Sequence, residues 1–120
     1  MNFVTLGAVS GFVAVAAGAF GAHALRERLP PNLLETFKTG ATYELVHALA
    51  LVAVGVLLAQ RGPNALLTWS GFLFVAGTVL FSGSLYALAL SGLRPLGAIT
   101  PFGGLAFLAG WACLALGARG

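Results

Sequence analysis

The sequence predicts an all-α integral membrane protein whose four transmembrane helices form an antiparallel bundle. Of its 120 residues, 59% are hydrophobic and only 8% are charged, and the mean hydropathy is +0.98. This composition excludes a soluble domain with a single core. The apolar residues form long runs, each close to the roughly 20 residues that a helix needs to cross about 30 Å of hydrocarbon. Because the segments between the runs are short, neighbouring helices are expected to run in opposite directions.

Almost no charged residues interrupt the apolar runs, which cover residues 3–23, 41–60, 65–90 and 98–118. The first run has no Lys or Arg before it and is longer than the core of a secretory signal, so we expect a retained span. Two of the connections, "RGPN" at 61–64 and "SGLRPLG" at 91–97, contain the Gly and Pro that end helices. The chain is therefore expected to fold as a single transmembrane domain over residues 1–120.

The first connection, "LRERLPPNLLETFKTG" at 25–40, is longer than the others. Asn32 is followed three residues later by Glu35, which is the spacing of a capping box at a helix start. This pattern predicts a short interfacial helix between the first two spans, which continues into the second span with a bend at Gly40. Its apolar side chains are expected to lie on the membrane surface: Leu33, Leu34 and Phe37.

The formal net charge of +3 comes from six basic and three acidic residues, nearly all in or near the connections. The charge therefore belongs to the loops, and we expect no nucleic-acid partner. Four basic residues lie on one side of the predicted bundle and two on the other: Arg26, Arg28, Lys38 and Arg94 against Arg61 and Arg119. The positive-inside tendency then places the first connection in the cytoplasm and both termini outside.

Small residues recur at spacings that allow close contact between membrane helices. They are Gly7 with Gly11, Ala14 with Gly18, Ala106 with Gly110, and Ala109 with Cys113 and Gly117. Two interpretations stay open, namely packing within the bundle and a homo-oligomer formed through these helix faces. Membrane lipid is the other expected partner. Cys113 is the only cysteine, which excludes an intrachain disulfide.

Polar residues collect toward one end of an antiparallel bundle. The candidate site residues are His23, Tyr43, Glu44, His47, Ser82, Ser84 and Tyr86. Glu44 and His47 are three residues apart, so they share one helix face, and ionisable groups in a membrane normally face the bundle interior. Arg26 or Arg28 is the expected partner of Glu44. His23 and Tyr86 are the expected hydrogen-bond partners of His47.

Four interpretations of this cluster stay open. It is a ligand pocket or translocation mouth, a polar knot that only holds the helices together, a metal or haem site, or a hydrolytic centre. "ELVH" has the Glu-x-x-His spacing of di-iron bundles, but those sites need two copies and more carboxylates. The serines lack any nucleophile motif. The sequence therefore favours a protein that is not an enzyme, with no catalytic residue, no cofactor and no metal.

Four segments, in this order, resemble a family of small four-span membrane proteins: "GAFGAHAL" at 18–25, "FKTGATYELVHALAL" at 37–51, "FSGSLYAL" at 81–88 and "ITPFGGLAFLAGW" at 99–111. The family is that of domain of unknown function 423, which looks related to transmembrane protein 256. The resemblance implies a multi-pass protein of the bacterial inner (plasma) membrane. His23, Tyr43 and His47 match the motif, whereas an amide is common in the family at the position of Glu44. The resemblance implies no activity, cofactor or partner.

From these observations we expect an integral inner-membrane protein that binds or translocates a lipid head group, an ion or a small solute. The binding site is expected in a polar pocket near the cytoplasmic face. The alternative is a structural or interaction subunit of a membrane complex, without ligand or catalysis, in which the polar cluster only locks the bundle.

Overall fold

A computed structural model describes residues 2–119 of the chain, and the secondary structure of this part consists of helices joined by short loops. It contains four helical stretches that are long and apolar enough to cross a membrane: Phe3–Leu25, Pro31–Arg61, Ala65–Ser91 and Arg94–Gly117. The predicted all-α fold with four spans is confirmed. The second span begins earlier than the sequence suggested, at Pro31.

The first span consists of α1 (Phe3–Val15), a π-helical segment (Ala16–Gly21) and α2 (Ala22–Leu25). The second span is the single helix α3 (Pro31–Arg61). The third consists of α4 (Ala65–Gly77), a π-helical segment (Thr78–Ser82) and α5 (Gly83–Ser91), and the fourth of a 3₁₀ turn (Arg94–Ala98) and α6 (Thr100–Gly117).

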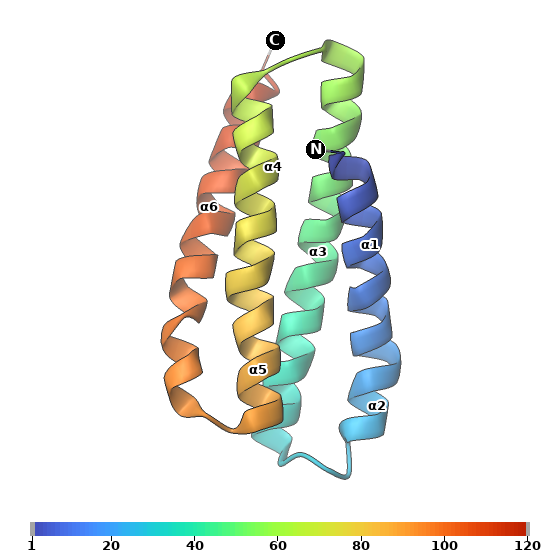
Figure 1. The fold of residues 1–120 in the computed structure, drawn as a ribbon, viewed down its shortest axis with the longest axis vertical. Coiled ribbons are helices and arrows are strands. Elements are labelled where there is room, and N and C mark those ends of the chain that lie inside the picture. The colour runs from blue at the N-terminus through green and yellow to red at the C-terminus, as the bar shows by residue number, and fades with distance from the viewer. Residues whose placement is uncertain (1, 120) are drawn as a thin grey trace.

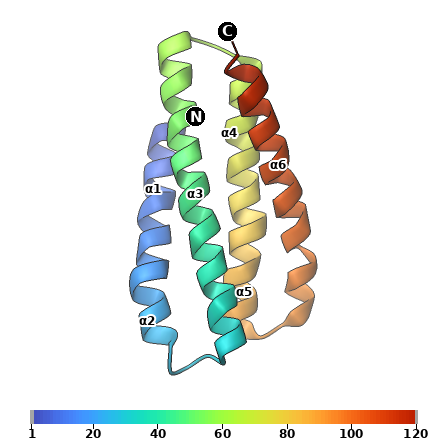
Figure 2. The same cartoon turned by 180° about the vertical axis from the view of Figure 1, so that it is seen from behind.

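The four spans form an elongated bundle of 49 × 26 × 20 Å, in which consecutive spans run in opposite directions (Figure 1). In both views α3 and α4 occupy the middle, α1 flanks α3, and α6 flanks α4 (Figure 2). The start of α1 and the end of α6 lie toward the end of the bundle that carries the loop between α3 and α4. Because of this order, α3 faces every other span at some point around its axis.

Two spans contain a turn of π-helix. The Ala22 amide donates to the Ala17 carbonyl, and the Gly83 amide donates to the Thr78 carbonyl, so each bond spans five residues instead of four. A π turn inserts a residue into the helix, widens it locally and changes the direction of the side chains that follow. In the third span this segment presents Thr78 and Val79 toward α1.

The helix predicted to begin in the first connection and to continue into the second span is present, as the first turns of α3, which is continuous from Pro31 to Arg61 and forms no distinct interfacial element. The helix begins with Pro31 in its first turn, where the missing amide proton costs nothing. Asn32 is therefore inside the helix and makes no side-chain cap. No bend is needed at Gly40, which instead leaves room for Tyr86: an added Cβ would come within 3.0 Å of the Tyr86 ring.

Several of the small residues predicted to lie at helix contacts pack within this chain. A Cβ at Gly7 would lie 2.8 Å from the Ala48 carbonyl oxygen on α3. A Cβ at Gly110 would lie 2.8 Å from the Phe74 ring on α4. Close backbone approach supplies the van der Waals contact that holds membrane helices together. Gly7 and Gly110 are thus occupied inside the bundle, whereas Gly18 and Ala109 are exposed, and the homo-oligomer remains an untested prediction.

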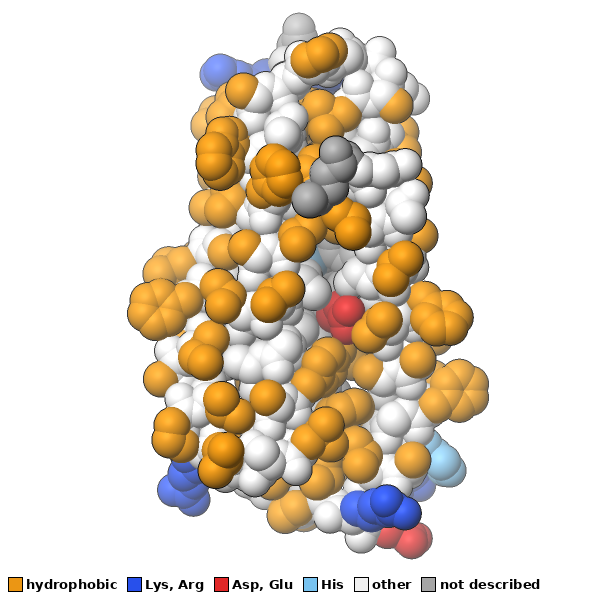
Figure 3. All heavy atoms as spheres, in the orientation of Figure 1, with side chains coloured by type: hydrophobic (Ala, Val, Ile, Leu, Met, Phe, Trp, Pro, Cys, Tyr) orange, Lys and Arg blue, Asp and Glu red, His pale blue; other side chains and the backbone are white. Residues whose placement is uncertain are grey.

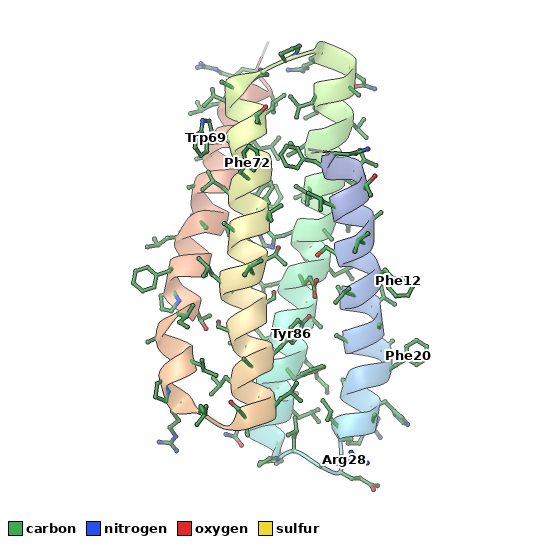
Figure 4. All side chains as sticks on the ribbon, viewed as in Figure 1. Phe12, Phe20, Arg28, Trp69, Phe72 and Tyr86 are labelled. Atoms are coloured by element: carbon green, nitrogen blue, oxygen red, sulfur yellow. The ribbon has the colours of Figure 1, made fainter. Side chains whose placement is uncertain are left out.

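The surface matches a protein surrounded by lipid. Basic side chains lie at the two ends of the bundle, and apolar side chains cover the zone between them (Figure 3). Phe12 and Phe20 point outward from the first span and are 77% and 74% exposed (Figure 4). In water such rings would be an aggregation surface, but in a bilayer they face hydrocarbon.

Candidate functional site

The carboxylate of Glu44 is the most unusual group inside the bundle. Glu44 lies on α3, about 20 Å along the helix from Pro31 at 1.5 Å per residue, and its side chain is only 6% exposed. The Ser10 hydroxyl on α1 donates to Glu44 Oε2 at 2.9 Å, and the Tyr86 hydroxyl on α5 donates to Glu44 Oε1 at 2.7 Å. Glu44 therefore joins three of the four spans.

No basic side chain compensates the charge of Glu44 among residues 2–119. The one ion pair of these residues joins Lys38 and Glu35 at 3.6 Å, on the exposed side of the first turns of α3. Arg26, an expected partner of Glu44, instead donates to His23. A carboxylate accepts about four hydrogen bonds, and Glu44 accepts two here, so each oxygen retains acceptor capacity.

Glu44 lines a groove of about 260 Å³ between α1 and the third span. α1 forms one wall, the π turn at Thr78 and Val79 forms part of the other, and α3 contributes Glu44 and, two turns further on, Leu51. Val13 and Val79 at its rim are 44% and 65% exposed, so the groove opens to the lipid-facing surface. Figure 3 shows an acidic side chain at mid-height on this face, between α1 and α4. The groove is apolar except for Glu44 and two hydroxyl groups.

His47 occupies a second, separate environment, where α3 faces α6. Its imidazole stacks on Phe107 of α6, with ring centroids 3.5 Å apart and an angle of 9° between the rings. The Trp111 indole N–H donates to His47 Nε2 at 3.0 Å, and His47 Nδ1 lies 2.7 Å from the Tyr43 carbonyl oxygen. Since a carbonyl only accepts, Nδ1 carries the proton. Both ring nitrogens are therefore satisfied by the neutral imidazole.

The predicted single cluster divides into parts. Tyr86 bonds to Glu44 instead of His47. Tyr43 contacts His47 through its backbone carbonyl, and its side chain is 44% exposed. His23 lies apart at the exposed end of the first span beside Arg26.

The two predicted serines serve the helix packing. The Ser82 hydroxyl donates to the Gly40 carbonyl at 2.7 Å, which fixes the third span against α3. The Ser84 hydroxyl is 2.6 Å from the Thr100 hydroxyl and 3.0 Å from the Phe81 carbonyl. Both side chains are buried and engaged, and neither contacts Glu44 or His47 in the bonds described.

Sequence reasoning missed two residues that complete these environments, Ser10 and Trp111. The signal for Ser10 was its position: it lies three residues after Gly7 and next to Gly11, on the small-residue face that packs against α3. Trp111 carried no such signal, because an aromatic residue deep in an apolar run usually serves only to pack against neighbouring helices. Only the fold shows that its indole reaches His47.

Residues 2–119 contain no group of three or more His, Cys, Asp or Glu side chains placed to hold a metal ion. The carboxylate of Glu44 and the imidazole of His47 face different helices, although they are three residues apart. The Glu-x-x-His spacing therefore does not converge on one ligand position within this chain.

Comparison with known proteins identifies the family. The model of the DUF423 family, described as a protein of unknown function, matches residues 17–104. The chain belongs to this family. It is 44% identical over 115 residues to the UPF0382 membrane protein SSP2132 of Staphylococcus saprophyticus, covering 96% of this chain and 94% of that protein.

Two further relatives show how widely DUF423-like chains occur. The UPF0382 inner membrane protein YgdD of Escherichia coli is 47% identical over 111 residues, which cover 92% of this chain and 84% of YgdD. The UPF0382 membrane protein YwdK of Bacillus subtilis is 43% identical over 116 residues, which cover 97% and 94%. No solved structure matches the chain. This DUF423 member is thus a multi-pass protein of the bacterial inner membrane.

Proposed function

We propose that this protein binds a small, mostly apolar solute within the membrane, in the groove between α1 and the third span. One observation carries the proposal: the groove is apolar apart from Ser10, Thr78 and the buried carboxylate of Glu44. Binding sites for small molecules are typically apolar clefts with a few polar groups that orient the ligand. The site lies deeper in the bundle than the polar mouth that the sequence predicted.

The cost of burying Glu44 supports a functional role. A charged side chain near the centre of a bilayer costs roughly 2.5 to 3.5 kcal/mol on insertion scales, and such residues mark substrate or ion pathways. A polar knot that only joins helices needs no acid, because an amide also bonds two hydroxyl groups. The volume of about 260 Å³ lies below the usual range of drug-sized pockets, which favours a small solute.

The second environment favours a structural role for His47 itself. Its two nitrogens are bonded and its ring is packed against Phe107. A group that is fully satisfied by its own chain has no free atom for a ligand. The structural interpretation of the polar residues therefore applies to His47, and the binding interpretation applies to Glu44.

The test uses N,N′-dicyclohexylcarbodiimide, an apolar reagent that reacts with carboxylic acids in apolar surroundings. Purified protein in mild detergent is treated with the reagent, and the labelled residue is found by peptide mass spectrometry. We expect the label on Glu44, because the groove admits an apolar molecule to this carboxyl group. Glu35 is the internal reference, since its side chain is 73% exposed to the aqueous phase.

A matched pair of variants shows whether the groove itself is the route. Val13→Phe fills the rim of the groove and should reduce labelling of Glu44 at least about fivefold. Val15→Phe makes the same change on the same helix outside the groove, at a residue that is 50% exposed, and should leave labelling unchanged. Absence of label on Glu44 in the unmodified protein, or equal labelling of the two variants, would contradict the proposal.

A further inference from the structure

We propose that the ligand of the groove is a lipophilic monovalent cation and that its binding at Glu44 displaces a proton. The inference rests on the proposed function, because it names the class of solute that the same groove takes. It adds an activity, which is exchange of a proton for an organic cation inside the membrane. Three features of the site carry it.

The first feature is the charge of the site. Glu44 is 6% exposed, and within residues 2–119 its carboxylate has neutral hydroxyl partners only. An ion without a counter-ion in apolar surroundings is expensive. The site is neutral in two ways: with a proton on the carboxyl group and no ligand, or with a carboxylate beside a bound cation. Exchange between these two states keeps the net charge of the membrane interior at zero.

The second feature is the pair of hydroxyl groups, which serve both states. In the cation-bound state Ser10 and Tyr86 both donate to the carboxylate, across the contacts of 2.9 and 2.7 Å that the structure shows. In the empty state the protonated carboxyl group donates to the Ser10 oxygen, and its other oxygen still accepts from Tyr86. A helical serine can then turn its own proton to a carbonyl one turn earlier. Neither state leaves a buried polar atom unpaired.

The third feature is the shape and lining of the groove. Its walls are valine and leucine side chains, and its rim opens to the lipid-facing surface at Val13 and Val79. A hydrated inorganic cation gains little from such walls, because it would lose its water and find few oxygen ligands. An organic cation with an alkyl body instead gains apolar contact along the groove and ionic contact with Glu44.

Among residues 2–119, no other charged group contacts Glu44 or lines the groove. Tyr86 on α5 is the titratable group that contacts it, and α1 contributes only the Ser10 hydroxyl. Thr78 and Val79 of the third span bring no charge to the groove. On α3 itself, the nearest titratable side chain toward the C-terminus is His47, whose ring bonds to Tyr43 and Trp111 on another side. The proton released on cation binding therefore comes from Glu44.

The experiment is isothermal titration calorimetry of the purified protein in a mild, uncharged detergent. The probe is hexyltrimethylammonium, and 1-nonanol, which is similar in size but uncharged, is the matched ligand. Each titration is repeated in phosphate and in Tris, which differ in ionisation enthalpy, so that the difference in heat gives the protons released. We expect hexyltrimethylammonium to bind at least tenfold more tightly than nonanol and to release about one proton.

Glu44→Gln is the decisive variant, because the amide keeps the hydrogen bonds and removes the charge. We expect at least a tenfold loss of hexyltrimethylammonium affinity, no proton release, and unchanged nonanol binding, which shows that the groove is intact. Glu35→Gln is the control and should behave as the unmodified protein. Its carboxylate lies at the surface beside Lys38.

The outcomes separate the two proposals. Cation binding without proton release would overturn the exchange and leave the proposed function standing. Nonanol binding without cation binding would overturn the ligand class. If neither probe binds while carbodiimide fails to label Glu44, the groove is not a binding site and both proposals fail.

Discussion

The Glu44 and His47 environments lie one helical turn apart on the same helix and have opposite character. The hydrogen-bonding capacity of His47 is filled, because one ring nitrogen donates, the other accepts, and the Phe107 ring stacks on the imidazole. The hydrogen-bonding capacity of Glu44 is not filled: its carboxylate accepts two hydrogen bonds, can accept more, and lines a groove that reaches the lipid-facing surface. Burial is nearly equal, at 5% exposure for His47 and 6% for Glu44. Burial alone therefore does not distinguish a structural polar group from a binding group; saturation of its hydrogen bonds does.

The difference arises from geometry around the axis of α3. Residues three apart on an α-helix point in directions about 60° apart. On a helix at the edge of a bundle, both would face the same neighbour. α3 lies in the middle, so this angle turns Glu44 toward α1 and α5 and turns His47 toward α6.

The largest expected effect is on stability at His47. His47→Ala removes the stacked ring and leaves the Trp111 N–H without its partner. We expect the free energy of unfolding to fall by about 2 to 4 kcal/mol, because of the cavity and the lost hydrogen bond. The measurement is unfolding by increasing fractions of SDS in mixed micelles. His23→Ala is the control because His23 is exposed, and equal effects of the two changes would refute a structural role for His47.

The next effect concerns the packing that brings Ser10 to Glu44. Gly7→Ala places a Cβ 2.7 to 2.9 Å from atoms of Val52 and Ala48, so α1 must move away from α3. We expect the free energy of unfolding to fall by about 1 to 3 kcal/mol. Carbodiimide labelling of Glu44 should become faster, because Ser10 moves with α1. Gly11→Ala meets only the Ala48 Cβ at 3.8 Å and should change neither quantity. Similar behaviour of the two variants would mean that this contact does not set the Glu44 site.

A smaller effect is expected at Tyr86. Tyr86→Phe removes the shorter of the two hydrogen bonds to Glu44 but keeps the ring that packs against Phe37, with centroids 5.1 Å apart. We expect a stability loss of about 1 to 2 kcal/mol, as for a hydrogen bond to a buried acid. SDS unfolding measures it, with Tyr43→Phe, at a 44% exposed side chain, as the control. A stability loss no larger than that of Tyr43→Phe would mean that the Tyr86 hydroxyl group contributes nothing to stability.

The smallest stability effect is expected for Glu44→Gln. An amide still bonds Ser10 and Tyr86, so SDS unfolding should shift by less than about 1 kcal/mol. Together with the result for His47→Ala, this small shift would show that the bundle needs the His47 side chain for its stability but does not need the charge of Glu44. A loss as large as that of His47→Ala would make Glu44 a structural residue as well.

The sequence by itself determined the class and the number of spans. Apolar runs of membrane length require helices, because the backbone finds no hydrogen-bond partners in lipid. Gly and Pro marked two of the connections, at residues 61–64 and 91–97, and the small-residue spacings marked helix faces that pack closely. Each of these features depends only on residues that are close together in the sequence, so it can be predicted without the tertiary structure. The capping-box prediction at Asn32 was also local, but Pro31 starts the helix one residue earlier.

Only the tertiary structure decided which polar groups meet. The sequence placed Glu44 and His47 in one cluster and offered Arg26 as a partner, whereas the bundle separates them and supplies Ser10, Tyr86 and Trp111. Such pairings depend on the rotation of each helix about its axis, on π turns that shift the side chains, and on α3 lying in the middle. In lipid these rotations are set by packing between helices, and that packing exists only once the spans have come together.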